Sequence, residues 1–171
     1  KLEESFTLTD GSTVVVRPIR PADEPAWHDM VASCSPDTLQ ARFFQSIGKT
    51  THAMATRYCY IDYDREMALV AIVEQPDGTD NMIGVGRLVC EPDGHSAEYA
   101  VIVADAYQNQ GLGKALTQQS LDVARGWGVQ RVFGTTAQNN KRMIATFEEH
   151  GFAITPDPED QSLVDAELVL N

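Results

Sequence analysis

Hydrophobic and polar positions in the first sixty residues predict a hairpin followed by helices. Two β-prone runs within residues 6–17 flank Asp10-Gly11, a dipeptide typical of tight hairpin turns. Apolar residues then recur with helical spacing over residues 23–32 and 37–44, and more weakly over residues 52–58. The amino-terminal third is therefore expected to contain two strands and a helical region.

The remainder of the chain predicts strands first and then alternating helices and strands. Apolar runs separated by Pro-Asp-Gly turns predict antiparallel strands at residues 68–74, 82–90 and 96–103. Further elements are expected as a helix at 111–125, a strand at 131–135, a helix at 140–150, and strands near 152 and at 162–170. This order predicts an α+β fold, with a mixed, mostly antiparallel sheet and helices on both faces.

Chain length favours one domain. The 171 residues are 43% hydrophobic, which suffices for one core and is short for two domains. We therefore expect a single domain over residues 1–171. Because the sequence begins at Lys1 and not at Met, we also expect that this domain was excised from a longer protein.

The net charge of the chain indicates which classes of binding partner are expected. There are 13 Lys and Arg against 25 Asp and Glu, a net charge of -12. The electric field of such a charge repels phosphate backbones and anionic lipids, which argues against nucleic-acid and membrane partners. It also favours a cationic acceptor. A need for solubility explains the same charge equally well. The three cysteines, Cys34, Cys59 and Cys90, form no zinc pattern, and no apolar run is long enough to span a membrane. A cytoplasmic protein with reduced thiols and no metal is expected.

A glycine-rich turn leads from a valine-rich strand into an amphipathic helix within residues 101–116. Gly111 and Gly113 let the backbone approach a ligand closely, and the free N–H groups of the first helical turn favour a pyrophosphate. Lys114 adds a charge or faces solvent. The turn is neither a Walker A loop, because Ala115 follows the lysine, nor a dinucleotide-binding fingerprint, because residue 116 is leucine. A turn that binds nothing remains the alternative.

This turn follows a valine-rich strand and has the sequence pattern Gln108-x-x-Gly111-x-Gly113. The pattern resembles the acetyl-CoA loop of the GNAT superfamily of N-acetyltransferases. Asn140, followed by an amphipathic helix up to Gly151-Phe152, resembles the next element of that superfamily. The resemblance implies a GNAT-like domain that uses acetyl-CoA as acyl donor and needs no metal.

A narrower resemblance lies outside this turn. The stretches at residues 10–20 and 61–71, together with Arg42-Phe-Phe, resemble the acetyltransferase domain of bacterial protein lysine acetyltransferases. This implies an acceptor lysine on a folded protein, for example an acyl-CoA synthetase.

The superfamily resemblance also implies roles for individual residues. The pantetheine arm would bond the backbone of Val101, Ile102 and Val103, where two strands splay apart. The pyrophosphate would lie on the backbone of the loop formed by Gln108, Asn109, Gln110, Gly111, Leu112, Gly113 and Lys114. Asn140 would lie near the cofactor arm, and a plain helix N-cap is its alternative interpretation.

Glu98 is the candidate general base. It shares a strand face with Ala100 and Ile102, and glutamate is a poor strand former, so a partly buried carboxylate is expected to have a function. The resemblance places the catalytic glutamate at the same position, whereas a solvated residue at a strand start is the alternative. A tyrosine acid common in the superfamily is replaced by Phe147. A thiol with a pKa near ~8.5 leaves without such an acid.

These observations predict an N-acetyltransferase that transfers an acetyl group to a primary amine by direct, base-assisted attack. A protein lysine is the expected acceptor. Two alternatives stay open: an enzyme that acetylates a small polyamine or aminoglycoside-like amine, and a domain that senses acyl-CoA without catalysis.

Overall fold

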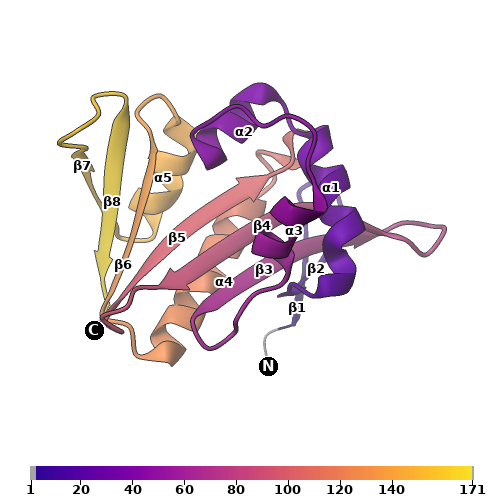
Figure 1. Cartoon of the computed structure of the whole chain (residues 1–171), viewed down its shortest axis with the longest axis horizontal. Coiled ribbons are helices and arrows are strands. Elements are labelled where there is room, and N and C mark those ends of the chain that lie inside the picture. Colours follow the sequence, from indigo (N-terminus) through magenta and orange to yellow (C-terminus); the bar gives the residue numbers. More distant parts are fainter. Residues whose placement is uncertain (1–2, 171) are drawn as a thin grey trace.

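One mixed sheet organises the chain in the computed structural model, which describes residues 3–170 (Figure 1). Its eight strands are β1 (Glu4–Thr7), β2 (Thr13–Pro18), β3 (Glu66–Glu74), β4 (Asp80–Cys90), β5 (Ser96–Val103), β6 (Arg131–Ala137), β7 (Ala153–Pro156) and β8 (Leu163–Val169). The helices are α1 (Glu24–Ser33), α2 (Pro36–Phe43), α3 (His52–Cys59), α4 (Leu112–Trp127) and α5 (Lys141–Glu149), with short 3₁₀ turns η1 (Pro21–Asp23) and η2 (Asp105–Tyr107). The expected α+β architecture is confirmed.

The strands lie in the order β1-β2-β3-β4-β5-β6-β8-β7. Adjacent strands are antiparallel except β5 and β6, which are parallel. A parallel pair needs a crossover connection, and α4 supplies it. The predicted hairpin is present, and Gly11 at its turn has a φ of +92°, a conformation that glycine adopts without strain.

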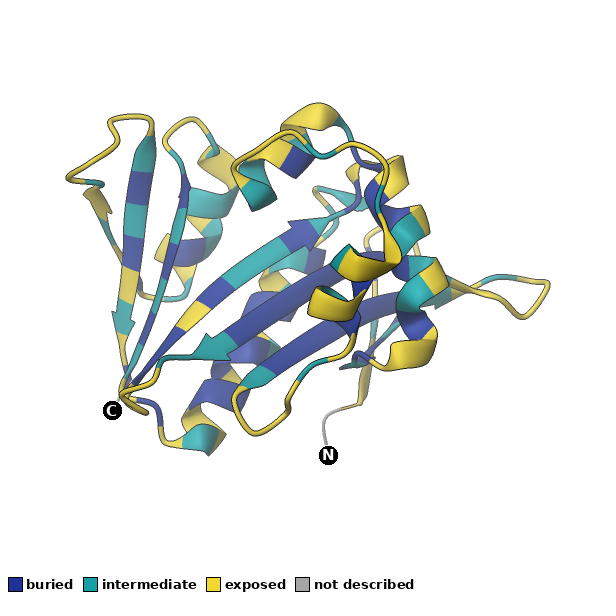
Figure 2. Ribbon diagram, viewed as in Figure 1, coloured by how far each residue is buried: buried dark blue, intermediate teal, exposed yellow. Residues whose placement is uncertain are grey.

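Two hydrophobic cores lie on opposite faces of the sheet. Residues of α4 and α5 pack on one face, and residues of α1, α2 and α3 pack on the other (Figure 1). Along β3 successive side chains alternate between them, since Leu69 belongs to the first core and Val70 to the second. Figure 2 shows the consequence: the central strands β3 and β4 are buried along most of their length. None of the helices in residues 3–170 is long and apolar enough to cross a membrane.

The parallel pairing of β5 with β6 is short. Only Ser96–Glu98 pairs with Arg131–Phe133, although both strands continue well beyond these residues. The strands then diverge, as the wedge between them in Figure 1 shows. This divergence leaves backbone groups of β5 without a neighbouring strand and positions the site described next.

Candidate active site

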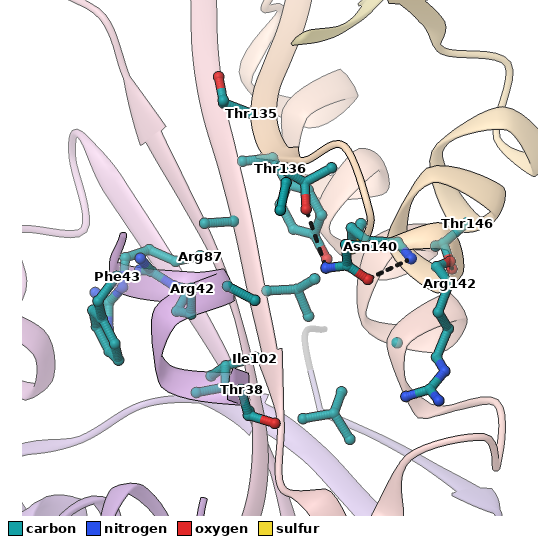
Figure 3. Close-up of a pocket in the computed structure, with 18 of the residues that line it drawn as sticks. Thr38, Arg42, Phe43, Arg87, Ile102, Thr135, Thr136, Asn140, Arg142 and Thr146 are labelled. Atoms are coloured by element: carbon teal, nitrogen blue, oxygen red, sulfur yellow. Dashed lines mark hydrogen bonds between the residues drawn. The ribbon is translucent and has the colours of Figure 1, made fainter. Parts of the chain in front are cut away.

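The diverging strands open into a cleft of about 1260 Å³. It is lined by β5 and β6, by α2 on one side, and by the starts of α4 and α5 on the other. Figure 3 shows Arg42, Phe43 and Arg87 grouped on one side of the cleft, and Asn140, Arg142 and Thr146 on the other. All the predicted site residues except Gln110 line this cleft.

The backbone of β5 faces the cleft at alternate residues. The N–H of Ala104 donates to the carbonyl of Ile83 on β4 at 2.8 Å, so the intervening residues Val101 and Val103 direct their N–H and C=O groups away from β4. The Val103 carbonyl accepts a 3.0 Å hydrogen bond from the Gln108 side chain. Ile102 differs from its neighbours, because its backbone faces β4 and its side chain is buried in a core.

The start of α4 has the features of an anion site. Gly111 is its N-cap, with a φ of +88° and no side-chain cap, and the first turn contains no acidic residue. The N–H groups of the first turn, including those of Leu112, Gly113 and Lys114, lack partners within the helix, and these residues line the cleft. With the positive end of the helix dipole, this arrangement fits a pyrophosphate.

The side chain of Gln108 holds this loop in place by hydrogen bonds to three other segments. Its Nε2 also donates to Thr38 on α2 at 3.2 Å, and its Oε1 accepts from Arg142 on α5 at 2.6 Å. The motif glutamine therefore connects both sides of the cleft. Gln110 does not line the cleft, and its Oε1 is buried without a hydrogen-bond partner among residues 3–170.

Asn140 is the N-cap of α5. Its Oδ1 accepts from the N–H of Met143 at 3.2 Å, and its Nδ2 donates to Thr136 at 3.1 Å, as the dashed lines in Figure 3 show. The helix-cap interpretation is confirmed. A contact of Asn140 with the cofactor arm stays a prediction.

Glu98 is the last residue of β5 that pairs with β6, and it lines the cleft where the strands part. The expected partial burial is wrong: Glu98 is exposed, because its side chain projects from the sheet face into the open cleft. Its neighbour Tyr99 points to the opposite face, where its hydroxyl lies 2.9 Å from Thr117 Oγ1. Tyr99 belongs to the core on that face, and burial raises the pKa of its hydroxyl.

Phe147, at the position of the missing tyrosine acid, is buried against Phe152, with ring centroids 4.8 Å apart. A Cβ added to Gly134 on β6 would meet its ring at 3.2 Å. The glycine leaves room for this ring, which supplies packing and no proton.

Sequence reasoning missed part of the cleft. Arg87 on β4 is buried, forms an ion pair with Glu66, and donates to the Tyr58 carbonyl at 2.8 Å. Arg42 lines the same side, and no role was assigned to it from the resemblance. The sequence feature that singled out Glu98, a lone charged residue within an apolar strand, is also present at Arg87 and could have identified it.

The cleft does not share the acidic excess of the chain. Its charged residues are Asp37, Glu66, Glu98 and Glu149 against Arg42, Arg57, Arg87, Lys114 and Arg142. The net charge of -12 therefore lies elsewhere on the molecule and gives no guide to the acceptor.

Two other chemistries find no support in residues 3–170. None of the three cysteines lines the cleft, and burial raises the pKa of Cys34 and Cys59 to about 11, far above that of a reactive thiolate. No group of three or more His, Cys, Asp or Glu side chains in this part of the chain is arranged to hold a metal ion.

Known proteins are similar to this chain in sequence and in fold. Residues 27–152 match the acetyltransferase (GNAT) family. Acetyltransferase PA5475 of Pseudomonas aeruginosa is 32% identical over 164 residues, covering 96% of this chain and 88% of that protein. The GNAT domain of S. lividans PAT superposes with a TM-score of 0.86 at 25% identity, covering 99% of this chain and 97% of that one. Spermidine N-acetyltransferase from Vibrio cholerae, solved with CoA and spermine, has the same fold at a TM-score of 0.71 and 17% identity, covering 91% of this chain and 95% of that one. With its fold, cleft and sequence match, the chain belongs to the GNAT family of acetyltransferases.

Proposed function

We propose that the chain transfers the acetyl group of acetyl-CoA to a primary amine by direct attack, with Glu98 as the general base. The observation that carries this proposal is the position of Glu98, an exposed carboxylate at the point where β5 and β6 part and the cleft opens. An acceptor that enters the cleft from the α2 side would cover this carboxylate.

The chemistry needs such a base. A lysine amine with a pKa near ~10.4 is only about one part in 2,500 neutral at pH 7, so its deprotonation costs roughly 4 to 5 kcal/mol. A carboxylate that accepts the proton directly or through water offsets this cost as the amine attacks. The N–H of Val101, which faces away from β4, would donate to the oxyanion that develops on the thioester carbonyl.

The cofactor is assigned to the other side of the cleft. The N–H groups from Gly111 to Lys114 would hold its pyrophosphate, and the backbone of Val101 and Val103 would hold its pantetheine arm. Acetyl-CoA supplies a thioester whose thiol has a pKa near ~8.5, so it leaves as thiolate without an acid at Phe147. Because the cysteines lie outside the cleft, we infer transfer without a covalent enzyme intermediate.

Replacing Gly113 with valine is expected to weaken acetyl-CoA binding at least ~10-fold without unfolding the protein. A Cβ at Gly113 would meet only Val103 Cγ2, at 3.9 Å, so the fold has room for it, whereas the branched side chain would occupy the space in front of the free N–H groups. Calorimetric titration measures the affinity. Gly126→Val in the same helix is the matched control, since a Cβ there meets nothing within 4 Å. Equal affinities for both variants would refute the loop assignment.

For the acceptor we propose a lysine side chain on a folded protein, with an acyl-CoA synthetase as the first candidate. Support comes from the likeness to the S. lividans PAT domain and from the Arg42-Phe-Phe segment, which lines the acceptor side of the cleft. A small amine is the second candidate, because a spermidine N-acetyltransferase has the same fold. The net charge of -12 argues against nucleic acid or an anionic membrane as partner.

The deciding experiment measures CoA release with a panel of acceptors: a purified acyl-CoA synthetase, spermidine, an aminoglycoside and free amino acids. Saturable release accompanied by one or a few acetyl-lysines in mass spectrometry is expected with the synthetase. Fast turnover of a small amine, without site-specific acetyl-lysine, would favour the second candidate. Tight CoA binding with no release for any acceptor would favour an acyl-CoA sensor.

A further inference from the structure

The acceptor side of the cleft concentrates arginines in an acidic protein, beside the carboxylates Asp37, Glu66 and Glu98. Arg42, Arg57 and Arg87 all line it, in a chain with only 13 basic residues and a net charge of -12. A site that binds only an ammonium group has no use for guanidinium groups, whereas an anionic group on the acceptor would interact with them. This side of the cleft is therefore arranged for more than an ammonium group.

The three arginines differ in how the protein satisfies them. Arg87 has Glu66 as ion-pair partner and the Tyr58 carbonyl as acceptor, so its charge is compensated. Arg57 is exposed to solvent and lies over the Tyr58 ring. Arg42 is half-buried, and within residues 3–170 its guanidinium forms no hydrogen bond or salt bridge. Its Cζ lies over the Phe43 ring, 4.8 Å from the centroid.

The surroundings of Arg42 oppose an uncompensated positive charge. Burial and the neighbouring Arg87 both lower the pKa of its guanidinium, which nevertheless stays charged because an arginine keeps its proton throughout the physiological pH range. An anion beside this group would gain charge-assisted hydrogen bonds, and a carboxylate matches the guanidinium fork in a bidentate way. No carboxylate in residues 3–170 forms an ion pair with Arg42, so a ligand can supply one.

The reacting carboxylate is close to this cation. Glu98 is one of the groups that act electrostatically on Arg42, and both line the acceptor side of the cleft. Strand register places Glu98 on the same sheet face as Arg87, since Glu98 pairs with Val89 and Arg87 pairs with Ala100. A base for the amine and an unsatisfied cation are thus within reach of one acceptor molecule.

We propose that Arg42 binds a carboxylate that the acceptor carries close to its amine. This inference rests on the proposed acetyl transfer at Glu98 and names the substrate class: an amine with a neighbouring carboxylate. The carboxylate can belong to either of two kinds of acceptor. It is the side chain of an acidic residue beside the acceptor lysine of a protein, or the carboxylate of a small amino acid. Polyamines, which lack an anion, are poor acceptors.

The test compares matched acceptors that differ only in this charge. One pair is a lysine peptide with an adjacent glutamate and the same peptide with glutamine; the other is free lysine and lysinamide. The wild-type protein should favour the carboxylate member of one pair by about 10- to 100-fold in kcat/KM, the range for a hydrogen bond between charged groups. The peptide pair reports a protein acceptor, and the lysine pair reports a small one.

Arg42→Gln should abolish this preference and leave the KM for acetyl-CoA unchanged. Arg57→Gln is the control, because Arg57 lines the same cleft but is exposed, and it should retain the preference. Urea midpoints of both variants check folding, and Arg42→Lys, which keeps the charge without the fork, should retain part of the preference. Turnover without preference in the wild type, or a preference that survives in Arg42→Gln, overturns the inference alone. No turnover with any amine rejects the proposed function and this inference together.

Discussion

Replacing Glu98 with glutamine is expected to lower kcat by about 10²-fold or more, in line with general-base contributions, and to leave the KM for acetyl-CoA nearly unchanged. The amide keeps the shape of the side chain but cannot accept the ammonium proton, so the roughly 4 to 5 kcal/mol cost of deprotonation is no longer offset. Steady-state CoA release, recorded over a range of pH with the best acceptor, measures the effect.

Two further variants test whether a loss of rate in Glu98→Gln is specific to that carboxylate. Glu74→Gln, an exposed carboxylate at the end of β3 and outside the cleft, should retain the wild-type rate. Glu66→Gln removes the ion-pair partner of Arg87 on the same side of the cleft as Glu98. A larger loss in Glu66→Gln than in Glu98→Gln would transfer the role of base to Glu66. Near-normal rates for Glu98→Gln at every pH would remove the role from Glu98.

Replacing Asp23 with alanine is expected to lower the free energy of unfolding by about 3 kcal/mol, because the buried Arg17 guanidinium loses its closest ion-pair partner and keeps the more distant Asp80, at 3.6 Å. Asp23 and Arg17 are 6% and 7% exposed and form two hydrogen bonds of 2.8 Å each. Asp23 also accepts from the N–H of Arg20 at 2.8 Å. The alanine variant would bury the Arg17 guanidinium without its bidentate partner. Urea denaturation at pH 7 measures the difference.

The pH dependence of this effect has a defined sign. Burial alone would raise the pKa of Asp23, but the hydrogen bonds from Arg17 and Arg20 outweigh it and hold the pKa below its ordinary value of 3.8. The difference between wild type and Asp23→Ala should thus be constant above that pH and shrink as pH falls through the lowered pKa. The double variant Arg17→Met/Asp23→Leu should lose less stability than Asp23→Ala. A double variant as unstable as the single one would contradict this account.

Much of the fold follows from local pattern. The alternation of apolar residues, the Pro-Asp-Gly turns and the glycine turn at residue 111 act over short stretches of chain, and the elements they predict agree with the structure to within a few residues. The loop proposed to bind the cofactor is local in the same sense, because it lies within one strand end, one turn and the start of one helix. Its roles still rest on resemblance and await the tests above.

The acceptor side of the cleft depends on contacts between distant segments. Arg42 comes from α2, Glu66 from β3, Arg87 from β4 and Glu98 from β5, and their proximity follows from strand register and from the packing of α2 over the place where β5 and β6 diverge. Residue pattern determined that Glu98 is an unusual strand residue, but not that it is exposed. Glu98 is exposed, and Arg42 has no ion-pair partner among residues 3–170, beside the place where the three-residue pairing of β5 with β6, Ser96–Glu98, ends. Where a strand pair ends is a property of the whole sheet and its helices, and no local pattern encodes it.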